Sequence, residues 1–409
     1  MSQALSHVTV LDLSRILAGP WAGQMLADLG AEVIKIERPE TGDDTRAFGP
    51  PFLRAVDERD SARADAAYYL CANRNKKSVT VDIATPEGQA IVRDLARRSD
   101  IVLENFKAGG LRAYGLDYDS LKLLNPRLIY CSITGFGQTG PYAPRAGYDF
   151  LIQGMGGLMS ITGRGADEPG AGPQKAGVAV ADILTGLYAS IGVLAALNHR
   201  ERTGVGQHID VALLDVQVAC LANQALNFLV SGQVPQRMGN AHPNIVPYQD
   251  FPTLDGHMII AVGNDAQFAR LCAAAGLSEL SGDPRFSTNE RRVGNREVLV
   301  EALCRATRLK STAQWIEELE RVGVPCGPIN SIDAVFADPQ VIARSMQIEL
   351  PHPVAGTVPL VANPLRLSET PVTYRSAPPV LGADTRQVLG SKLGLSDPEL
   401  DALTAKGII

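Results

Sequence analysis

Asp182 is the leading candidate for a nucleophile in this chain of 409 residues. It lies in Gly177-Val-Ala-Val-Ala-Asp-Ile-Leu-Thr-Gly186, where small apolar residues open a long apolar helix. Burial would strip water from the carboxylate while the helix N-terminus keeps it ionised, so that it could attack an acyl carbon. A helix N-cap, where aspartate is common, explains the same residue, and the local sequence alone favours this second interpretation.

A second carboxylate, Asp149, stands shortly before the glycines of Gly154–Gly157. Asp149 could assist Asp182, and the glycines would let backbone amides approach an oxyanion. A turn aspartate followed by tightly packed glycines accounts for these residues slightly better.

Basic residues gather near the ends of the expected strands: Arg15, Arg38, Arg46, Lys76, Lys77, Lys107, Arg112 and Arg145. Ligands of open α/β sheets bind at the carboxyl ends of the strands, so together these cations predict a polyanionic ligand. Each one alone is more typical of a solvated surface charge. The net charge of -6 argues against a nucleic-acid partner.

The distribution of cysteine and histidine predicts neither disulfides nor a metal site. The six cysteines are scattered without a CxxC motif, and none of the six histidines has metal-ligand spacing. This usage, with no signal peptide in Met1–His7, predicts a cytoplasmic location. The apolar stretch Ile183–Leu197 is too short to span a bilayer, which predicts a buried helix and no membrane partner.

The elements that must position these residues begin with a strand, a helix and a second strand. Val8–Ser14 is typical of a buried strand that stops at the turn Ala18-Gly19-Pro20, Trp21–Leu29 has helical spacing, and Val33–Glu37 is again strand-like. Further strands are expected at 77–82, 101–104 and 128–133, with helices such as 87–98 between them, which indicates a parallel sheet. The fold is therefore predicted to be α/β and Rossmann-like, yet Ser14–Gly19 lacks the GxGxxG pattern of NAD sites.

The rest of the chain predicts a second, smaller domain. We expect a large domain at 1–215, a linker at 216–248 reached through a long helix at 212–229, an α+β domain at 249–335, and a segment at 336–409 that returns to the large domain. In the small domain, Asn295 and Ser311 are expected N-caps of two helices. The polar stretch Asn240–Gln249 could face a substrate or form an interdomain turn.

Taken together, these motifs resemble those of the family III CoA-transferases along nearly the whole chain. The residues that carry the resemblance are Leu11–Leu13, Ala18–Pro20, Leu29–Pro39, Gly42–Arg46, Asn73–Ser78, Glu104–Phe106, Gly135–Pro141, Asp182 with Thr185 and Gly186, and His199–Gln207. The family also includes acyl-CoA racemases.

The resemblance implies an interlocked homodimer in which Asp182 is the nucleophile, reversing the preference for a cap. It also implies that a CoA thioester, bound as a substrate, contacts Arg15, Leu17, Ala18, Arg38, Val81, Asp82, Ile83, Ala84, Asn105, Phe106, Lys107, Arg145 and Tyr148. No permanent cofactor and no metal are expected. We further hypothesise that Arg46, or His242 and Tyr248, binds the far carboxylate of a dicarboxylic acid.

Departures from the family pattern narrow the expected reaction. Leu17 replaces the glutamine of formyl-CoA transferases, Tyr148 replaces the histidine of the racemases, and Ala113 replaces an arginine found in many members. The greatest similarity is to succinyl-CoA:dicarboxylate transferases, through Arg46–Pro51, Asn240–Gln249 and Val335–Gln340.

We therefore expect CoA to pass from succinyl-CoA to a dicarboxylate such as glutarate or hydroxymethylglutarate. The expected route is an aspartyl anhydride followed by an aspartyl thioester. The alternatives are an acyl-CoA racemase, a nucleotide-binding oxidoreductase and a non-catalytic CoA-binding scaffold.

Overall fold

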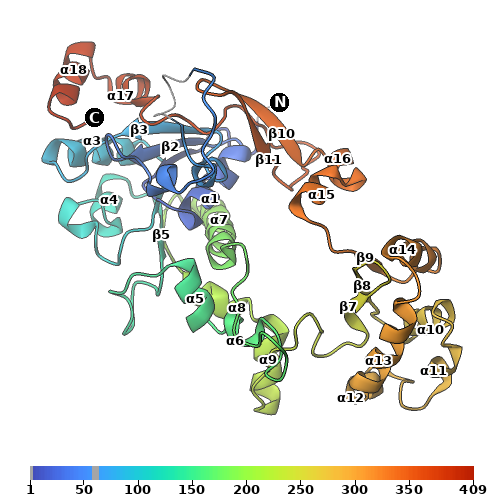
Figure 1. Ribbon diagram of the computed structural model, residues 1–409. Helices are drawn as coiled ribbons and strands as arrows, with labels where there is room; N and C mark the ends of the chain where they lie inside the picture. The colour runs from blue at the N-terminus through green and yellow to red at the C-terminus, as the bar shows by residue number, and fades with distance from the viewer. Residues whose placement is uncertain (1–2, 58–63) are drawn as a thin grey trace. The chain divides into compact units, whose positions relative to one another are not determined.

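The computed structural model describes residues 3–57 and 64–409 (Figure 1). The chain divides into two compact units, and each is described by itself. Unit 1 comprises Met1–Leu158, Ala176–Val230 and Gln340–Ile409, and unit 2 comprises Met159–Lys175 and Ser231–Pro339. Unit 1 thus extends beyond the boundary expected at residue 215. The segment Met159–Lys175, which was expected in the large domain, belongs to unit 2.

Unit 1 is built on a six-stranded parallel sheet, as the alternation of strands and helices predicts. Its strand order is β3-β2-β1-β4-β5-β6, so the direction of winding reverses between β1 and β4. The strands are β1 (Thr9–Asp12), β2 (Glu32–Glu37), β3 (Lys76–Thr80), β4 (Ile101–Glu104), β5 (Ile129–Thr134) and β6 (His208–Ala212). Such a reversal is where open α/β sheets bind their ligands.

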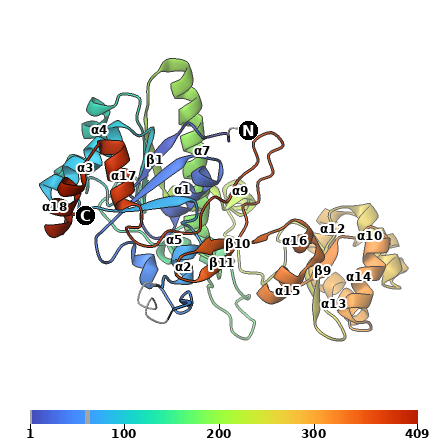
Figure 2. The same ribbon diagram turned by 90° about the horizontal axis from the view of Figure 1, so that it is seen from above.

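Helices cover both faces of this sheet (Figure 2). One face packs against α1 (Ala18–Asp28), α5 (Asp149–Met155), α7 (Val180–Thr203) and α8 (Leu213–Ala219) through a core that includes Leu26 and Val193. The other face packs against α3 (Pro86–Arg97), α4 (Tyr118–Leu124), α17 (Thr385–Leu393) and α18 (Asp397–Ala405) through a core that includes Leu95 and Leu389. Unit 1 also contains the short helices η1 (Asp44–Ala47), α2 (Ala67–Leu70) and η3 (Arg112–Tyr114).

The start of α1 corrects one prediction. Ala18-Gly19-Pro20, expected to be a turn, forms the first turn of the helix. Proline is tolerated there because the first amides of a helix have no intrahelical acceptor. The loop between β1 and α1 is consequently shorter than predicted, and Ser14–Leu17 lead directly into the helix.

Helix α7 is longer than predicted. It runs over 24 residues, because Val180–Asp182 before the apolar stretch Ile183–Leu197 and the polar residues after it continue the helix. By length and composition it could cross a membrane, which corrects the prediction made from the apolar stretch alone, yet half of its apolar window is buried inside the chain. The buried residues include Asp182 and Arg200. Burial of this kind is also found in the core helix of a globular domain.

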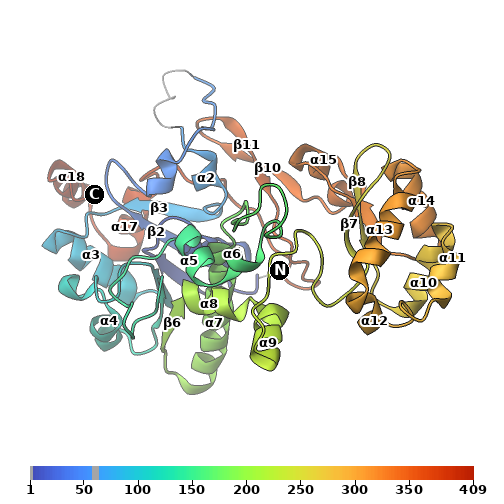
Figure 3. The same ribbon diagram turned by 60° about the horizontal axis from the view of Figure 1, so that its bottom comes forward.

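The long helix expected at 212–229 is instead two helices. Helix α8 ends at Ala219, and α9 (Ala222–Ser231) follows after a bend of 71° (Figure 3). Ala222 has a positive φ of 46°, which a continuous helix does not allow. By length and composition, the two helices together could also form one broken membrane span.

The C-terminal segment of unit 1, which ends in α17 and α18, also contains a hairpin. Strands β10 (Gln347–His352) and β11 (Gly356–Val361) pair antiparallel, and α16 (Pro339–Ala343) stands before them. The segment is tied to the sheet by Asp384, whose carboxylate accepts the amide of Ser78 at 2.9 Å. Thr385 extends the contact because its hydroxyl accepts the amide of Thr80 at 3.0 Å.

Unit 2 contains a three-stranded antiparallel sheet, β7 (Tyr248–Pro252), β8 (His257–Ala261) and β9 (Cys326–Pro328), in the order β7-β8-β9. Its helices are α6 (Leu158–Ile161), α10 (Asp265–Ala274), α11 (Ser278–Gly282), α12 (Asn289–Gly294), α13 (Arg296–Thr307), α14 (Thr312–Arg321) and α15 (Ile332–Ala337). Ser311 caps α14 in a capping box, as predicted. Asn295 precedes α13, but its side chain makes no capping hydrogen bond.

Candidate active site

A pocket of about 430 Å³ opens at the carboxyl ends of β1, β4, β5 and β6, within unit 1. Asp182 from the first turn of α7 forms part of its wall. The remaining lining includes the residues after β1, the loop after β4 and the loop before α5: Arg15, Ile16, Leu17, Ala18, Asn105, Phe106, Lys107, Tyr114, Thr134, Gly135, Arg145, Gly147 and Tyr148. We call this cavity the nucleophile pocket.

A second pocket of about 240 Å³ lies at the carboxyl ends of β1, β2 and β3. It shares Arg15, Phe106 and Tyr114 with the nucleophile pocket, so the two cavities adjoin. Its other walls come from Leu13, Ile36, Glu37, Arg38, Gly42, Asp43, Val81, Asp82, Ile83 and Ala84. We call it the strand-end pocket.

All the residues expected to contact CoA fall in one or both of these adjoining pockets. They arrive from five separate loops and from the start of α1, because each stands just beyond the end of a parallel strand or in the loop before α5. The two adjoining cavities, with arginines at their border, match an elongated ligand. Its acyl group would lie in the nucleophile pocket, and its phosphates would lie near the arginines. Contact with CoA itself remains a prediction.

Asp182 is buried, with 8% of its surface exposed, and stands at the third position of α7. It is therefore not the N-cap, which is Ala179. Burial, followed by the negative charge of Asp149, raises the pKa of Asp182 to about 7. The carboxylate, which the helix N-terminus was expected to keep ionised, is therefore ionised mainly above pH 7, because burial favours the neutral acid.

Asp149 occupies the N-terminus of α7. Its carboxylate accepts the amide of Ala181 at 2.8 Å and that of Asp182 at 3.4 Å. It also accepts a hydrogen bond from the Gln153 amide at 2.6 Å, while the Gln153 oxygen accepts the amide of Ala176 at 2.9 Å. These contacts give Asp149 the capping role that local sequence assigned to Asp182. Asp149 therefore fixes the turn that carries Asp182, and its charge raises the pKa of that neighbour.

The cations at the border of the two pockets are already engaged by an acid. Asp44 accepts hydrogen bonds from Arg15 at 2.8 Å and from Arg38 at 3.0 Å. All three side chains remain more than one third exposed, so the pairs are weak and accessible to an anionic ligand. Arg15 also lies 5.7 Å from the centre of the Phe106 ring, which places its charge beside both cavities.

Asn105 binds the backbone of the loop after β1. Its side-chain oxygen accepts the amide of Arg15 at 2.9 Å, and its nitrogen donates to the carbonyl of Arg15 at 2.6 Å. Both ends of the Asn105 amide are thus used within the chain. The residue shapes the nucleophile pocket through Arg15 as well as lining it.

Two glycines make one wall of the nucleophile pocket possible. A β-carbon on Gly135 would lie 2.5 Å from the α-carbon of Gly147, and one on Gly147 would lie 2.4 Å from the α-carbon of Gly135. No side chain fits at such distances, so the loop before α5 can approach the end of β5 only through glycine. This contact brings Tyr148 to the pocket.

The glycines at the C-terminal end of α5 are poorly placed for the oxyanion site that the sequence suggested. Gly154–Gly157 are absent from the lining of the nucleophile pocket. The amide of Gly156 donates to Ile152 at 2.7 Å, and Gly156 packs against Gln217, where a β-carbon would lie 2.4 Å from the side chain. Close packing, the simpler of the two interpretations, is the one that these contacts favour.

Arg46 lies outside both pockets and is 8% exposed. Its guanidinium donates twice to Glu37, at 2.7 and 2.9 Å, and once to Asp65, at 2.8 Å. It also donates to the hydroxyl of Tyr69 at 2.6 Å. Because its donors are directed to buried partners, these contacts favour a structural role for Arg46, and its binding of an acceptor carboxylate stays a prediction.

The other two residues suggested for the acceptor, His242 and Tyr248, lie together in unit 2. Their rings are 5.2 Å apart, and the His242 amide donates to the carbonyl of Tyr248 at 3.0 Å. His242 also accepts the amide of Asn244 at 3.1 Å through Nδ1. These contacts stabilise the turn before β7, and the role of the pair toward an acceptor stays a prediction.

Tyr68 lies outside the lining of both pockets, but it interacts electrostatically with Asp182, which the sequence analysis missed. It is half-buried on α2, and burial together with the charges of Asp182, Asp149 and Asp43 raises its pKa to about 12. The phenol therefore stays protonated near the nucleophile. No local pattern could have singled it out, because Tyr68 and Asp182 are 114 positions apart in the sequence.

Among residues 3–57 and 64–409, no group of three or more histidine, cysteine, aspartate or glutamate side chains is arranged to hold a metal ion. The six cysteines, all within this part of the chain, are free thiols.

The family model described as CoA-transferase family III matches residues 5–385. A succinate–glutarate CoA-transferase from Agrobacterium fabrum is 54% identical over 385 residues, which is 94% of this chain and 94% of that protein. A succinyl-CoA:glutarate CoA-transferase from Mus musculus is 44% identical over 405 residues, covering 99% of this chain and 90% of the relative.

A solved structure shares the fold. The crystal structure of a CAIB/BAIF family protein from Brucella suis superimposes with a TM-score of 0.83 at 51% sequence identity. The match covers 96% of this chain and 100% of the other.

Proposed function

The chain belongs to CoA-transferase family III, and we propose that it transfers CoA from succinyl-CoA to glutarate. Two relatives with 54% and 44% identity bear names that state this pair of substrates, and the alignments cover at least 90% of each protein. Hydroxymethylglutarate, which has the same five-carbon backbone with two terminal carboxylates, is the second acceptor that we propose.

The observation that carries the proposal is the position of Asp182. Its carboxylate is buried in the wall of a pocket whose other walls come from strand ends, and that pocket adjoins a second cavity with arginines at the border. A buried carboxylate has lost the water that would make it a poor nucleophile, and it faces a cavity large enough for an acyl group. We therefore assign the nucleophilic role to Asp182.

The first half of the proposed reaction loads CoA onto the protein. An Asp182 oxygen attacks the thioester carbonyl of succinyl-CoA, the carbon–sulfur bond breaks, and a mixed anhydride and CoA thiolate form. The thiolate then attacks the Asp182 carbonyl carbon, which gives an aspartyl-CoA thioester and releases succinate. Each step exchanges one acyl bond for another, so no net proton is taken up or released.

The second half reverses these steps with the acceptor. A glutarate carboxylate attacks the aspartyl thioester, which regenerates CoA thiolate and gives a second anhydride. The thiolate attacks the glutaryl carbonyl, so glutaryl-CoA leaves and the Asp182 carboxylate is restored. Asp149 keeps the first turn of α7 in place throughout, because its carboxylate binds the amides of Ala181 and Asp182.

The test is an incubation with succinyl-CoA and one acid at a time: glutarate, hydroxymethylglutarate, malate, citramalate, itaconate or oxalate. The CoA esters are then identified by mass. Glutaryl-CoA formed with an equal loss of succinyl-CoA would support the proposal, whereas transfer only to malate, citramalate, itaconate or oxalate would overturn the substrate assignment. Exchange of the α-hydrogen of an acyl-CoA for solvent deuterium, with no acceptor present, would indicate the alternative racemase activity.

The pH dependence of the reaction should follow the ionisation of Asp182. Only the carboxylate is nucleophilic, and its pKa is raised to about 7. We expect kcat/KM for succinyl-CoA to fall about tenfold per pH unit below pH 7 and to level off above pH 8. Initial rates between pH 5 and 9 measure this, with each sample returned to pH 8 to check that activity recovers. A profile that stays flat down to pH 5.5 would contradict the raised pKa.

We further propose that the protein acts as a homodimer, as the family resemblance implies. Apolar side chains stay exposed on α7 (Tyr188, Ile191 and Leu194) and on α9 (Leu226, Leu229 and Val230). An exposed apolar surface of this kind is typical of an interface. Light scattering after size exclusion should give twice the 43.5 kDa of one chain at micromolar concentration. A mass of one chain under those conditions would contradict the proposal.

A further inference from the structure

Ile16, between β1 and α1, has a backbone conformation that its side chain disfavours. Its φ is 71°, in the left-handed region, where a β-branched residue is strongly disfavoured. Ile16 lines the nucleophile pocket together with Leu17 and Ala18, which follow it directly. Strain of this kind persists only where the surroundings hold it, and it is found most often at functional sites.

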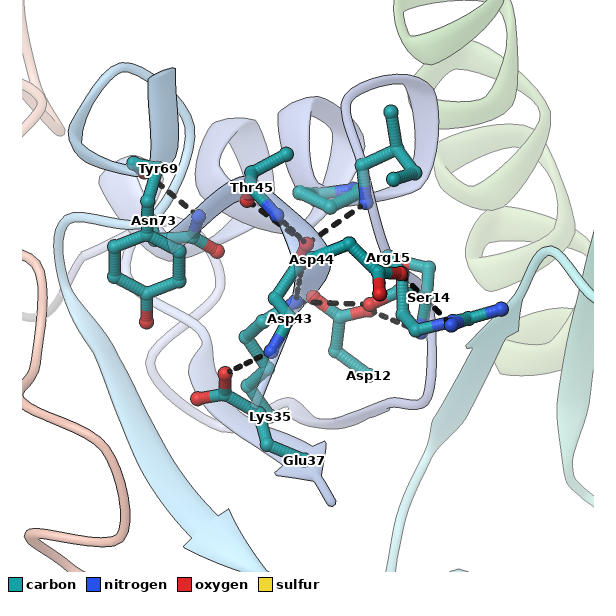
Figure 4. Close-up of polar contacts among 12 residues, drawn as sticks. Asp12, Ser14, Arg15, Lys35, Glu37, Asp43, Asp44, Thr45, Tyr69 and Asn73 are labelled. Atoms are coloured by element: carbon teal, nitrogen blue, oxygen red, sulfur yellow. Dashed lines mark hydrogen bonds and ion pairs between the residues drawn. The ribbon is translucent and has the colours of Figure 1, made fainter. Parts of the chain in front are cut away.

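Asp43 is the side chain that holds this turn (Figure 4). Its Oδ1 accepts the amide of Ile16 at 3.2 Å, and it also accepts the amide and the hydroxyl of Thr45 at 3.0 and 2.8 Å. Its Oδ2 accepts Nζ of Lys35 at 2.9 Å. Both carboxylate oxygens are therefore occupied, and Asp43 is 1% exposed.

Asp43 is kept ionised by its hydrogen-bond partners and by the nearby Lys35 ammonium. Burial alone would raise its pKa, but the Lys35 ammonium and the Thr45 hydrogen bonds lower it to about 2. Lys35 donates to the carbonyl of Ser14 at 2.8 Å as well, so one ammonium ties the carboxylate to the residue two positions before Ile16. The backbone amide of Asp43 donates to Glu37 at 2.9 Å, which fixes the loop on which the carboxylate stands.

We infer that Asp43 is a positioning residue for CoA transfer: it holds Ile16 in the left-handed conformation so that Leu17 and Ala18 form the wall of the nucleophile pocket beside Asp182. The inference rests on the proposed function, because it states that the hydrogen bond between Asp43 and Ile16 affects the rate of CoA transfer. Asp43 itself contacts the strand-end pocket and lies outside the lining of the nucleophile pocket.

Asparagine is an informative replacement because it keeps the shape of aspartate. If the amide oxygen faces Ile16 and Thr45, the amide nitrogen faces the Lys35 ammonium, and two donors meet. If the amide is flipped, its nitrogen meets the N–H groups of Ile16 and Thr45 instead. Neither orientation satisfies all four donors that Asp43 accepts, so Asp43→Asn should release the turn.

Glycine at position 16 separates positioning from general stability. Glycine adopts a φ of 71° without the steric cost of a β-carbon, so the turn would need no restraint. Ile16→Gly in the Asp43→Asn background should therefore restore much of the lost rate. If Asp43 served only the stability of the fold, removing the isoleucine side chain would restore nothing.

The experiment compares four proteins in the succinyl-CoA assay: the wild-type chain, Asp43→Asn, Asp43→Asn with Ile16→Gly, and Glu40→Gln as a control. Glu40 is an exposed carboxylate on the same loop. We expect Asp43→Asn to lower kcat about 10–100-fold, because a small displacement of the reacting groups has an effect of that size. The double variant should recover at least half of the decrease in log kcat. The kcat of Glu40→Gln should stay within about twofold of the wild type.

Two further measurements separate the possible failures. Circular dichroism at the assay temperature checks that each variant is folded, and titration with free CoA should show a dissociation constant within about threefold of the wild type. A folded Asp43→Asn with unchanged kcat, or a loss that Ile16→Gly does not relieve, would overturn the inference. If the wild-type chain transfers CoA to no acid in the panel, the proposed function fails first, and that result is distinct from the other two.

Discussion

Replacing Asp182 with asparagine should abolish CoA transfer and, at neutral and higher pH, should make the fold more stable. The rate should fall by about four orders of magnitude or more, since removing a covalent nucleophile has effects of this size. Incubation with succinyl-CoA should load CoA covalently onto the wild-type chain and leave the variant unlabelled, as measured by intact mass. Asp215→Asn is the matched control, because Asp215 also stands in the first turn of a helix but is exposed.

The expected gain in stability follows from the pKa of Asp182. The folded chain raises it to about 7 from the ordinary 3.8, so the folded state binds more protons than the unfolded state between those values. The free energy of unfolding therefore decreases as the pH rises through that window, and above pH 7 the full cost of the buried charge is present. Asparagine carries no charge, so the variant should be more stable at pH 8 by on the order of a few kcal/mol.

Urea denaturation at pH 8 and at pH 4 measures this difference. The gain should be present at pH 8 and largely absent at pH 4, where the wild-type carboxyl is protonated in the folded state. An inactive variant with a higher unfolding midpoint at pH 8 could not owe its inactivity to unfolding. Equal stability of the two proteins at pH 8 would contradict the raised pKa, and retained transfer by the variant would exclude Asp182 as the nucleophile.

The parts of the site that follow from strand order could be predicted from the sequence. Apolar runs and helical spacing locate the strands, and parallel strands place the residues that follow them at one edge of the sheet. Arg15, Arg38 and Asn105 each come just after such a run, and the structure brings them to adjoining pockets. The order β3-β2-β1-β4-β5-β6 supplies the reversal at which those pockets lie.

The parts that depend on pairing between distant residues could not be predicted. Asp149 caps a helix that begins 31 positions later, and nothing in the residues around it distinguishes a cap from a turn. The left-handed Ile16 depends on Asp43, which stands on a different loop. Local sequence also missed the break before Ala222, because apolar helical spacing continues across it and only the backbone shows the bend.

Arg46 is the clearest case of a residue whose type suggested a ligand and whose partners indicate a structural role. Its acidic partners are Glu37, on β2, and Asp65, near the start of α2, and it also lies over the ring of Tyr69 at 3.7 Å. It donates further to the carbonyl of Pro379, more than 300 positions away. One guanidinium thus joins the N-terminal half of unit 1 to its C-terminal segment.

Arg46→Leu should therefore destabilise the protein strongly. Glu37 and Asp65 are both less than one tenth exposed, and without the guanidinium they would be left as buried acids without their cation. Breaking a buried pair by removing one partner costs about 3–5 kcal/mol, so the unfolding midpoint in urea should fall clearly at pH 7. Arg46→Lys should lie between the wild type and Arg46→Leu, because an ammonium cannot reproduce the two parallel bonds to Glu37.

Arg386→Leu is the matched control for burial. Arg386 also bridges two acids, Asp397 at 2.9 Å and Asp401 at 2.7 Å, but its side chain is 48% exposed. Water screens such pairs, so its loss should lower stability far less than the loss of Arg46. Similar losses for the two leucine variants would contradict the argument from burial.

The kinetics of Arg46→Lys decide between the two roles of this arginine. A structural role predicts a KM for glutarate within about twofold of the wild type wherever the variant is folded, since the guanidinium lies outside both pockets. A contact with the acceptor carboxylate instead predicts a large rise in the KM for glutarate with no rise for succinyl-CoA. Since the donors of Arg46 are directed to Glu37, Asp65 and Tyr69, we expect the first result.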